Sequence, residues 1–343
     1  MKYTTIIDIA KELGISKSTV SRALSGDTHN VKPETMKLIC ETAKRMGYQR
    51  NEMAVNLRRQ TTHNIGIIIP EVVTSFFMNF IQQAQKELRN HGYRTIIAVS
   101  NENPDQEAEN LQMLVQCRVE GILMSVCHKD KNALLYNKIV SHGIPIVFFD
   151  RKVEGIEASV VCLDDNLMAF FMVERLIRSG CRKIVHMSGP EHISNGYDRY
   201  RGYREALEKF SIPYDPRYVI NGGLSAEEGS AAIEKFLSQG LEFDGLFGFT
   251  EASTLGAKSL LQKKHYRIPE DVSLCCISGT MLCTLVHPMV TAVEQPVNKM
   301  ATLSCQLLIN QIADPNAARE SVILRGNIEE RESTLTIQRM FRT

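Results

Sequence analysis

Continuous apolar runs alternate with amphipathic segments from residue 65 onward, and this alternation limits the fold more than any other feature. The runs are short, as in IGIIIP (65–70) and PIVFFD (145–150), while the segments between them have helical spacing. Strands that are apolar along their whole length are buried on both faces, which is typical of parallel sheets covered by helices. The rhythm runs to residue 165 and resumes at 183, which predicts two α/β lobes of similar size.

The same pattern predicts the individual elements. Strands are expected at 65–70, 93–100, 121–126, 145–150, 160–165, 183–190, 218–223, 245–251, 272–279, 290–296 and within 321–331. Helices are expected near 77–91, 104–117, 130–142, 166–179, 198–210, 225–239, 252–264 and 297–313.

The first 49 residues show a different pattern, of short helices. Residues 5–24 read as two helices joined at Gly14, the first capped by Thr5 with Asp8 and the second by Ser16. The first helix has an apolar stripe made of Ile6, Ile7, Ile9, Ala10 and Leu13. A third helix follows Pro33 and has an apolar face made of Met36, Ile39, Cys40, Ala43 and Met46. The three helices predict a small head whose core is marginal in stability.

The second helix of this head has two chemically different faces. Its apolar face consists of Val20, Ala23 and Leu24. Its opposite face is small, polar and cationic and consists of Lys17, Ser18, Ser21 and Arg22. Such a helix can enter a DNA major groove, because the apolar back packs on its neighbour while the front reaches base edges. The alternative is an ordinary helical hairpin with a solvated face.

Charge is distributed unevenly along the chain. Residues 1–60 contain 11 Lys and Arg against 6 Asp and Glu, whereas the whole chain contains 40 against 39. The head therefore carries a net charge of +5 and the remainder −4. A basic head on a mildly acidic body fits a nucleic-acid module joined to a domain with another task.

Residues 50–63 connect the head to the lobes. Asn51 can cap a helix that is too short to be stable by itself. Arg58 and Arg59 can contact phosphates. Leu57 has no obvious core to join, so it either wedges between base steps in the minor groove or packs on the body as a linker residue.

Together these segments resemble the LacI/GalR family of transcriptional regulators, which includes the lac and purine repressors. The resemblance runs almost end to end. The segments that carry it are TIIDIAKELGISKSTVSRAL (5–24), NEMAVNLR (51–58), IGIIIPEVVTSFF (65–77), RKIVHMSGP (182–190) with Arg199 and Gly202, IPEDVSLCCIS (268–278), HPMVTAVEQP (287–296) and RESTL (331–335).

The resemblance implies a three-helix helix-turn-helix head (1–49), a hinge helix and linker (50–63) and a two-lobed body like a periplasmic binding protein. The N-lobe would comprise residues 64–162 and 293–324, and the C-lobe residues 163–292 and 325–343. The implied function is sequence-specific regulation of transcription by a homodimer on double-stranded operator DNA. A sugar or related metabolite between the lobes would control its affinity. The sequence leaves open whether the effector promotes or releases binding, and whether the protein represses or activates.

The resemblance also implies which residues contact DNA. They are Thr5, Ser16, Lys17, Ser18, Thr19, Ser21 and Arg22 in the head, and Asn51, Ala54, Leu57 and Arg58 in the hinge. Arg22 is the best candidate to read a guanine, a contact worth about 1–3 kcal/mol of base discrimination. Where the family usually has Pro before the hinge asparagine, this chain has Arg50, so the hinge starts less rigidly.

The effector is expected beyond the carboxyl ends of the strands, where open α/β sheets bind ligands. The implied cleft residues are Phe76, Phe77, Cys127, Asp150, Asn195, Arg199, Leu224, Glu251 and Ser278. Arg199 would grip ligand oxygens, or else form a surface ion pair. Asp150 would contact the ligand, or else act as a structural acid between the lobes. Ser278 stands where many members have an Asp that pairs with sugar hydroxyls, which leaves the effector's identity open.

Two other classes of protein remain as alternatives. A periplasmic solute-binding protein needs a secretory signal, but MKYT is followed by no apolar core of that kind, so we expect a cytoplasmic protein. An α/β enzyme is disfavoured because GxGxxG, GxxxxGK[ST], GxSxG and HExxH are missing. No apolar run approaches the ~20 residues of a membrane span. The nine cysteines lack zinc-like spacing and are interpreted as reduced core residues, so no metal or cofactor is expected.

Overall fold

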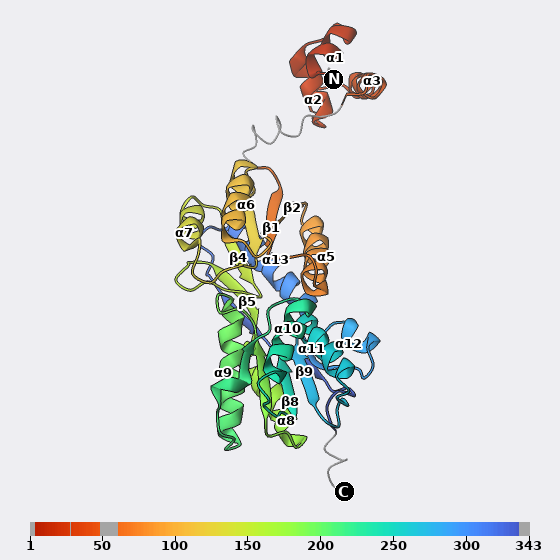
Figure 1. Ribbon diagram of the computed structural model, residues 1–343. Coiled ribbons are helices and arrows are strands. Elements are labelled where there is room, and N and C mark those ends of the chain that lie inside the picture. The colour runs from red at the N-terminus through yellow and green to blue at the C-terminus, as the bar shows by residue number, and fades with distance from the viewer. Residues whose placement is uncertain (1–3, 28, 49–60, 336–343) are drawn as a thin grey trace. The chain divides into compact units, whose positions relative to one another are not determined.

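The computed structural model describes residues 4–27, 29–48 and 61–335, which belong to two compact units that divide between Thr62 and His63 (Figure 1). The four predicted hinge contacts, Asn51, Ala54, Leu57 and Arg58, lie outside the described residues.

The first unit contains, in its described part, the helices α1 (Ile6–Leu13), α2 (Lys17–Leu24) and α3 (Pro33–Arg45). Both predicted caps are present. Thr5 Oγ1 accepts from the Asp8 backbone N–H at 3.3 Å, and the Asp8 carboxylate accepts from the Thr5 N–H at 2.8 Å. Gly14 ends α1 at φ 65°, a left-handed conformation that glycine adopts without strain.

The core of this head is formed by a small set of apolar side chains from all three helices and from the loop between α2 and α3: Ile9, Ala10, Val20, Ala23, Val31, Ile39 and Ala43. For two residues, the prediction of a position in this core is wrong. Ile7 is 48% exposed, because it projects about 100° around the helix from Ile6. Cys40 is also exposed, at the edge of the stripe on α3, where the head is too small to cover it.

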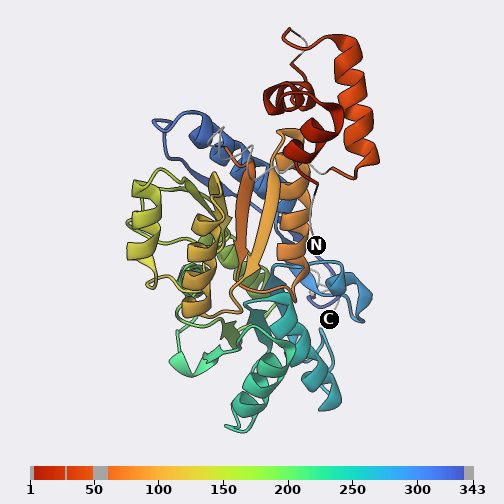
Figure 2. The ribbon, with the colours of Figure 1, turned by 90° about the horizontal axis from the view of Figure 1, so that it is seen from above.

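The first sheet of the second unit is parallel throughout, with the strand order β11-β5-β4-β3-β1-β2. Its strands are β1 (Asn64–Ile69), β2 (Arg94–Val99), β3 (Gly121–Met124), β4 (Ile146–Phe149), β5 (Ser159–Leu163) and β11 (Ser321–Leu324). Helices α5 (Ser75–Asn90) and α13 (Val297–Ala313) pack side by side on one face (Figure 2). Helices α6 (Pro104–Gln116) and α7 (Ala133–Ser141) cover the other.

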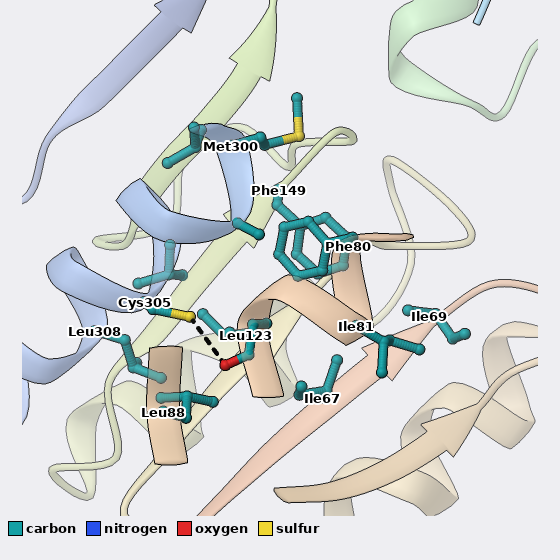
Figure 3. Close-up of a cluster of buried hydrophobic side chains, with 14 of the residues drawn as sticks. Ile67, Ile69, Phe80, Ile81, Leu88, Leu123, Phe149, Met300, Cys305 and Leu308 are labelled. Carbon is teal, nitrogen blue, oxygen red and sulfur yellow. Dashed lines mark hydrogen bonds between the residues drawn. The ribbon is translucent and has the colours of Figure 1, made fainter. Parts of the chain in front are cut away.

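The core between α5, α13 and the first sheet is shown in Figure 3. The rings of Phe80 and Phe149 stack with centroids 3.5 Å apart. The Cys305 thiol lies 3.8 Å from the Ala84 carbonyl oxygen, to which it donates. The ring stack joins α5 to β4, and the thiol contact joins α5 to α13, although these two helices are about 200 residues apart in the sequence.

The second sheet has the strand order β12-β10-β9-β8-β6-β7, in which β12 runs antiparallel to β10. Its strands are β6 (Ile184–Ser188), β7 (Val219–Asn221), β8 (Gly245–Gly248), β9 (Ser273–Ile277), β10 (Thr291–Glu294) and β12 (Asn327–Glu329). One face is covered by α8 (Asp165–Arg178) and α9 (Ser194–Lys209), and the other by α10 (Ala226–Leu237) and α11 (Glu251–Lys263). The short helices η1 (Pro216–Tyr218) and α12 (Leu282–Leu285) lie in connections.

Within the described residues the chain crosses between the two sheets three times: from β5 to α8, from β10 to α13, and from β11 to β12. All of β10 pairs within the second sheet, so the crossing follows Glu294 and comes two residues later than the expected boundary at 292/293. Residues 321–331 supply two short strands to different sheets.

All nine cysteines are free thiols, as expected. Seven are buried, but Cys40 and Cys117 are exposed, and the prediction of a core position is wrong for both. Cys117 follows the last turn of α6, where the chain turns toward solvent. Of the helices in the described ranges, none is long and apolar enough to cross a membrane.

Candidate functional site

Helix α2 presents the predicted polar residues on one side. Lys17, Ser18 and Arg22 are exposed, whereas Val20 and Ala23 are buried against the head. Neither Lys17 nor Arg22 has an acidic partner within 4 Å among the described residues. The cationic charge on this side is therefore available to phosphates and base edges.

The start of α2 is fixed by a cluster of hydroxyl groups. Ser16 Oγ accepts from the Thr19 backbone N–H at 3.1 Å and lies 2.7 Å from Ser18 Oγ. Thr19 Oγ1 is 2.8 Å from the same oxygen. Ser16 and Thr19 are thus engaged in capping the helix. The cap fixes the first turn of α2, from which the side chains of Lys17 and Ser18 project.

The predicted effector contact Arg199 lies at the centre of a buried cluster of the C-lobe, which we call the floor and which includes Asp165 and Phe249. Its Nε donates to Asp165 Oδ1 at 2.7 Å, and its Nη1 donates to the Phe249 carbonyl. The guanidinium carbon lies 4.4 Å from the centre of the Phe249 ring. Arg199 is only 2% exposed. The alternative of a surface ion pair is therefore wrong in its location: the pair exists, but it is buried within the C-lobe.

Asp165 is the partner that the sequence analysis did not identify as a site residue. It lies two residues beyond the end of β5, so the rule that strand ends carry ligand-binding side chains would have found it. Burial raises the pKa of this carboxyl group to about 7, although the charge of Arg199 opposes the increase.

This raised pKa has a measurable consequence. A carboxyl group with a higher pKa in the folded state than in the unfolded chain stabilises the fold at low pH, and that contribution is lost as the pH rises. We expect the stability of the wild-type body to decrease between about pH 4 and pH 7 more steeply than that of Asp165→Asn, whose amide does not titrate. Urea unfolding of both proteins across this range measures the difference in slope, and equal slopes would contradict the assignment.

Asp150 lies at the end of β4 and is also buried. Its backbone has φ 60°, a conformation that Asp tolerates better than most residues. Burial raises the pKa of its carboxyl group, while the charges of Arg151 and Arg199 oppose this.

Glu251, at the start of α11, is turned toward its own lobe. Its carboxylate accepts from the Thr280 backbone N–H at 2.7 Å and from the Cys283 N–H at 3.1 Å. It also accepts from the Thr280 hydroxyl. Glu251 therefore positions the segment after β9, which carries Ser278.

Ser278 is held by a residue of the crossover to the N-lobe. Its hydroxyl accepts from Gln295 Nε2 at 2.6 Å. Both residues line a pocket of about 480 Å³ together with Phe76, a size that suits a small ligand. Gln295 is a further pocket-lining residue that sequence reasoning did not single out, although it lies within the segment HPMVTAVEQP (287–296).

Most of the remaining predicted cleft residues make contacts within their own lobes. The Cys127 N–H donates to Glu107 Oε2 at 2.9 Å, and burial raises the pKa of its thiol. Phe76 and Phe77 belong to the core of the N-lobe. The Leu224 N–H donates to Glu228 Oε2 at 2.9 Å near the start of α10.

The two lobes touch at both sides of the cleft. On one side the Lys129 N–H donates to the His192 carbonyl at 2.9 Å, and the Lys152 N–H donates to Ser194 Oγ at 3.1 Å. On the other side Ser75 Oγ donates to Thr280 Oγ1 at 3.3 Å. These three hydrogen bonds join the two lobes directly, and Asp150 and Arg199 are both buried in this arrangement.

The described residues contain no cluster of three or more His, Cys, Asp or Glu side chains arranged to hold a metal ion. The groups gathered there are carboxylate, guanidinium, amide and hydroxyl groups beside aromatic rings, which are groups that can contact an organic ligand.

Two family models match the chain. One, described as periplasmic binding proteins and sugar binding domain of LacI family, covers residues 62–324. The other, described as bacterial regulatory proteins, lacI family, covers residues 5–51. The chain therefore belongs to the LacI family of bacterial regulatory proteins, and it is a transcriptional regulator, not an enzyme. The predicted family and function class are confirmed.

Individual relatives agree with this assignment. Catabolite control protein A of Priestia megaterium is 28% identical over 331 residues, 96% of this chain and 99% of the relative. Among solved structures, the complex of the transcriptional regulator CelR with cellobiose is 24% identical, with a TM-score of 0.74, and covers 96% of this chain and 99% of that chain. The lac repressor dimer bound to operator and the anti-inducer ONPF is 19% identical, with a TM-score of 0.86 and coverages of 98% and 100%. These structures confirm the predicted fold class.

Proposed function

We propose that this regulator binds operator DNA as a homodimer in the cytoplasm, with α2 of each head in the major groove. The observation that carries the proposal is the exposed pair Lys17 and Arg22 on a helix whose start is fixed by Ser16. A single head offers few contacts, so two heads on adjacent half-sites are needed for useful affinity.

A surface patch of the body supports the homodimer. Six exposed apolar side chains come from both lobes: Val72, Val73, Met78, Met281, Leu282 and Leu285. The hydrogen bond between Ser75 and Thr280 brings the two groups together, so they form one patch. Exposed apolar patches of this kind mark interaction sites. The lac repressor structure, which is a dimer, supports a second copy of this chain as the occupant.

The effector would act by preferring one arrangement of the lobes. A ligand in the cleft shifts DNA affinity only as far as it binds one arrangement more tightly than the other. The relative bound to cellobiose supports a sugar or a related metabolite as the ligand. The proposed contacts are the predicted cleft residues around Arg199, together with Asp165 and Gln295.

We expect Arg22→Ala to lose base discrimination at one position of each half-site. Duplexes selected from a random library by the full-length protein provide the operator. Loss of a bidentate guanine contact costs about 1–3 kcal/mol, or about 5- to 150-fold in affinity. Binding titrations on the selected duplex and on single-base variants measure this effect.

Arg45→Ala is the matched control, because Arg45 is an exposed arginine of the same head that lies on α3 and pairs with Glu12 at 2.9 Å. It should change affinity by no more than about twofold. Equal losses for both variants on every sequence would mean that Arg22 supplies only general charge. Failure to select any duplex would contradict the proposed function itself.

A further inference from the structure

One side of the contact between the lobes contains a pair of histidines. His128 follows β3 in the N-lobe, and His192 precedes α9 in the C-lobe. Their imidazole rings are stacked, with centroids 5.2 Å apart and an angle of 16° between the ring planes. The Lys129 N–H donates to the His192 carbonyl at 2.9 Å, so the pair belongs to the backbone contact that joins the lobes. Two side chains of the type that gains a charge near neutral pH therefore face each other across the lobes.

The geometry around His128 requires a neutral ring. Its Nδ1 accepts a hydrogen bond from the Asp130 backbone N–H at 3.1 Å, which is possible only when this nitrogen carries no proton. The neutral ring then carries its proton on Nε2. A second proton must enter at Nδ1, so it removes the acceptor of the Asp130 N–H and adds a positive charge to the stack.

The basic groups around the pair favour the neutral state. Burial lowers the pKa of His192, and the charges of His128, Arg151 and Lys129 lower it further. Glu102 acts in the opposite direction, but both of its carboxylate oxygens are engaged by the Arg151 guanidinium, at 2.9 and 2.8 Å. A base whose pKa is lower in the joined lobes takes up its proton more readily when they separate, so a falling pH favours separation.

The other acidic groups on this side are solvated or paired. Asp130 and Glu191, in the two loops that carry the histidines, are exposed, so water screens their attraction for a protonated ring. Asp198 lies 3.5 Å from Lys152 Nζ in an ion pair across the lobes. Both members of that ion pair keep their charges between pH 5 and pH 8, so the histidines are the groups on this side whose charge changes there.

We propose that His128 and His192 form a pH-sensitive latch between the lobes. Neutral rings stack and keep this side of the contact joined, whereas protonated rings repel each other and release it. The ordinary pKa of histidine is about 6.5, so we expect the latch to hold at pH 7.5 and to open toward pH 5.5. The proton would thus be a second regulator of the lobe arrangement, whatever the effector is.

Hydrogen exchange of the full-length protein, resolved to single amides by mass spectrometry, tests the latch. The Lys129 and Lys152 N–H groups donate across the lobes, so their protection reports whether this side is joined. After correction for the intrinsic exchange rate, protection of both amides should fall at least fivefold between pH 7.5 and pH 5.5. The Ser125 N–H, which donates to the Ile68 carbonyl at 3.0 Å within the N-lobe, should keep its protection. Unchanged protection of the two interlobe amides, or an equal loss at Ser125, would overturn the proposal.

The double substitution His128→Gln with His192→Gln separates the latch from other groups that titrate in this range, such as Asp165. Glutamine can accept a hydrogen bond but takes up no proton, so protection of the two interlobe amides should no longer depend on pH. If protection in the double variant fell with pH as steeply as in the wild type, the histidines would not be the sensor.

His91→Gln is the matched control. His91 is an exposed histidine of the N-lobe whose Nδ1 lies 3.1 Å from the Glu87 carbonyl oxygen of its own helix. This variant should show the same pH dependence as the wild type, and loss of that dependence would contradict the assignment to the stacked pair. The exchange measurement needs neither DNA nor effector, so its result is independent of the proposed function.

Discussion

Arg199→Met should destabilise the body by about 3–5 kcal/mol near neutral pH, because it leaves Asp165 buried without its cation. Methionine fills a similar volume but cannot donate to Asp165 or to the Phe249 carbonyl, which both lose their hydrogen bonds. The loss should be smaller at pH 5 than at pH 8, since Asp165 becomes neutral by taking up a proton. Urea unfolding followed by far-UV circular dichroism measures it.

Arg201→Met provides the matched control, two residues further along α9. Arg201 is half exposed and pairs with Asp198 at 3.7 Å and with Glu205 at 3.4 Å. Exposed pairs of this kind contribute about 0–1 kcal/mol. Combining Arg199→Met with Asp165→Leu should restore part of the stability, because the uncompensated charge disappears. If Arg199→Met and Arg201→Met both lost as little stability as an exposed pair contributes, Arg199 would not be the centre of the floor.

Gly256→Ala should destabilise the body by about 1–3 kcal/mol, although alanine favours helices over glycine by about 1 kcal/mol. Helices α10 and α11 approach so closely that a Cβ at Gly256 would lie 1.8 Å from the Ala226 carbonyl oxygen. A Cβ at Gly229 would lie 2.0 Å from the Ser253 carbonyl oxygen. Backbone atoms cannot rotate away, so the helices must separate.

The effect of this substitution should extend to the cleft. Glu251 stands at the start of α11 and holds the segment from Thr280 to Cys283. A shift of α11 would therefore move the wall that carries Ser278 and weaken ligand binding as well as stability. Ser259→Ala, on the exposed side of the same helix, should change neither quantity measurably. Unfolding curves for Gly256→Ala that match those of the wild type would show that the helices can adjust at little cost.

The sequence predicted those features that depend on local pattern. The apolar runs at 65–70 and 145–150 became β1 and β4 with shifts of one residue, because strands buried on both faces leave an unmistakable pattern. The caps at Thr5 and Ser16 were predictable for the same reason, since their bonds span three residues. The predicted core positions of Ile7 and Cys40 were wrong, because hydropathy alone does not show how far a small core extends.

Features that depend on distant residues were not predictable in this way. The partner of Arg199 is 34 residues away in the sequence, and the partner of Ser278 lies in a crossover. Only the folded topology brings these groups together.

The three crossings between the lobes also bear on how the protein is made. The first sheet needs β11, and its core needs Met300 and Leu308 of α13, yet the ribosome delivers these residues after most of the second lobe. During synthesis α5 must therefore cover one face of the early strands without α13, so that part of this face stays uncovered. Contacts so remote in sequence slow folding and leave apolar surface open to aggregation. For such a chain, translation speed and chaperone supply become part of what determines how much regulator a cell obtains.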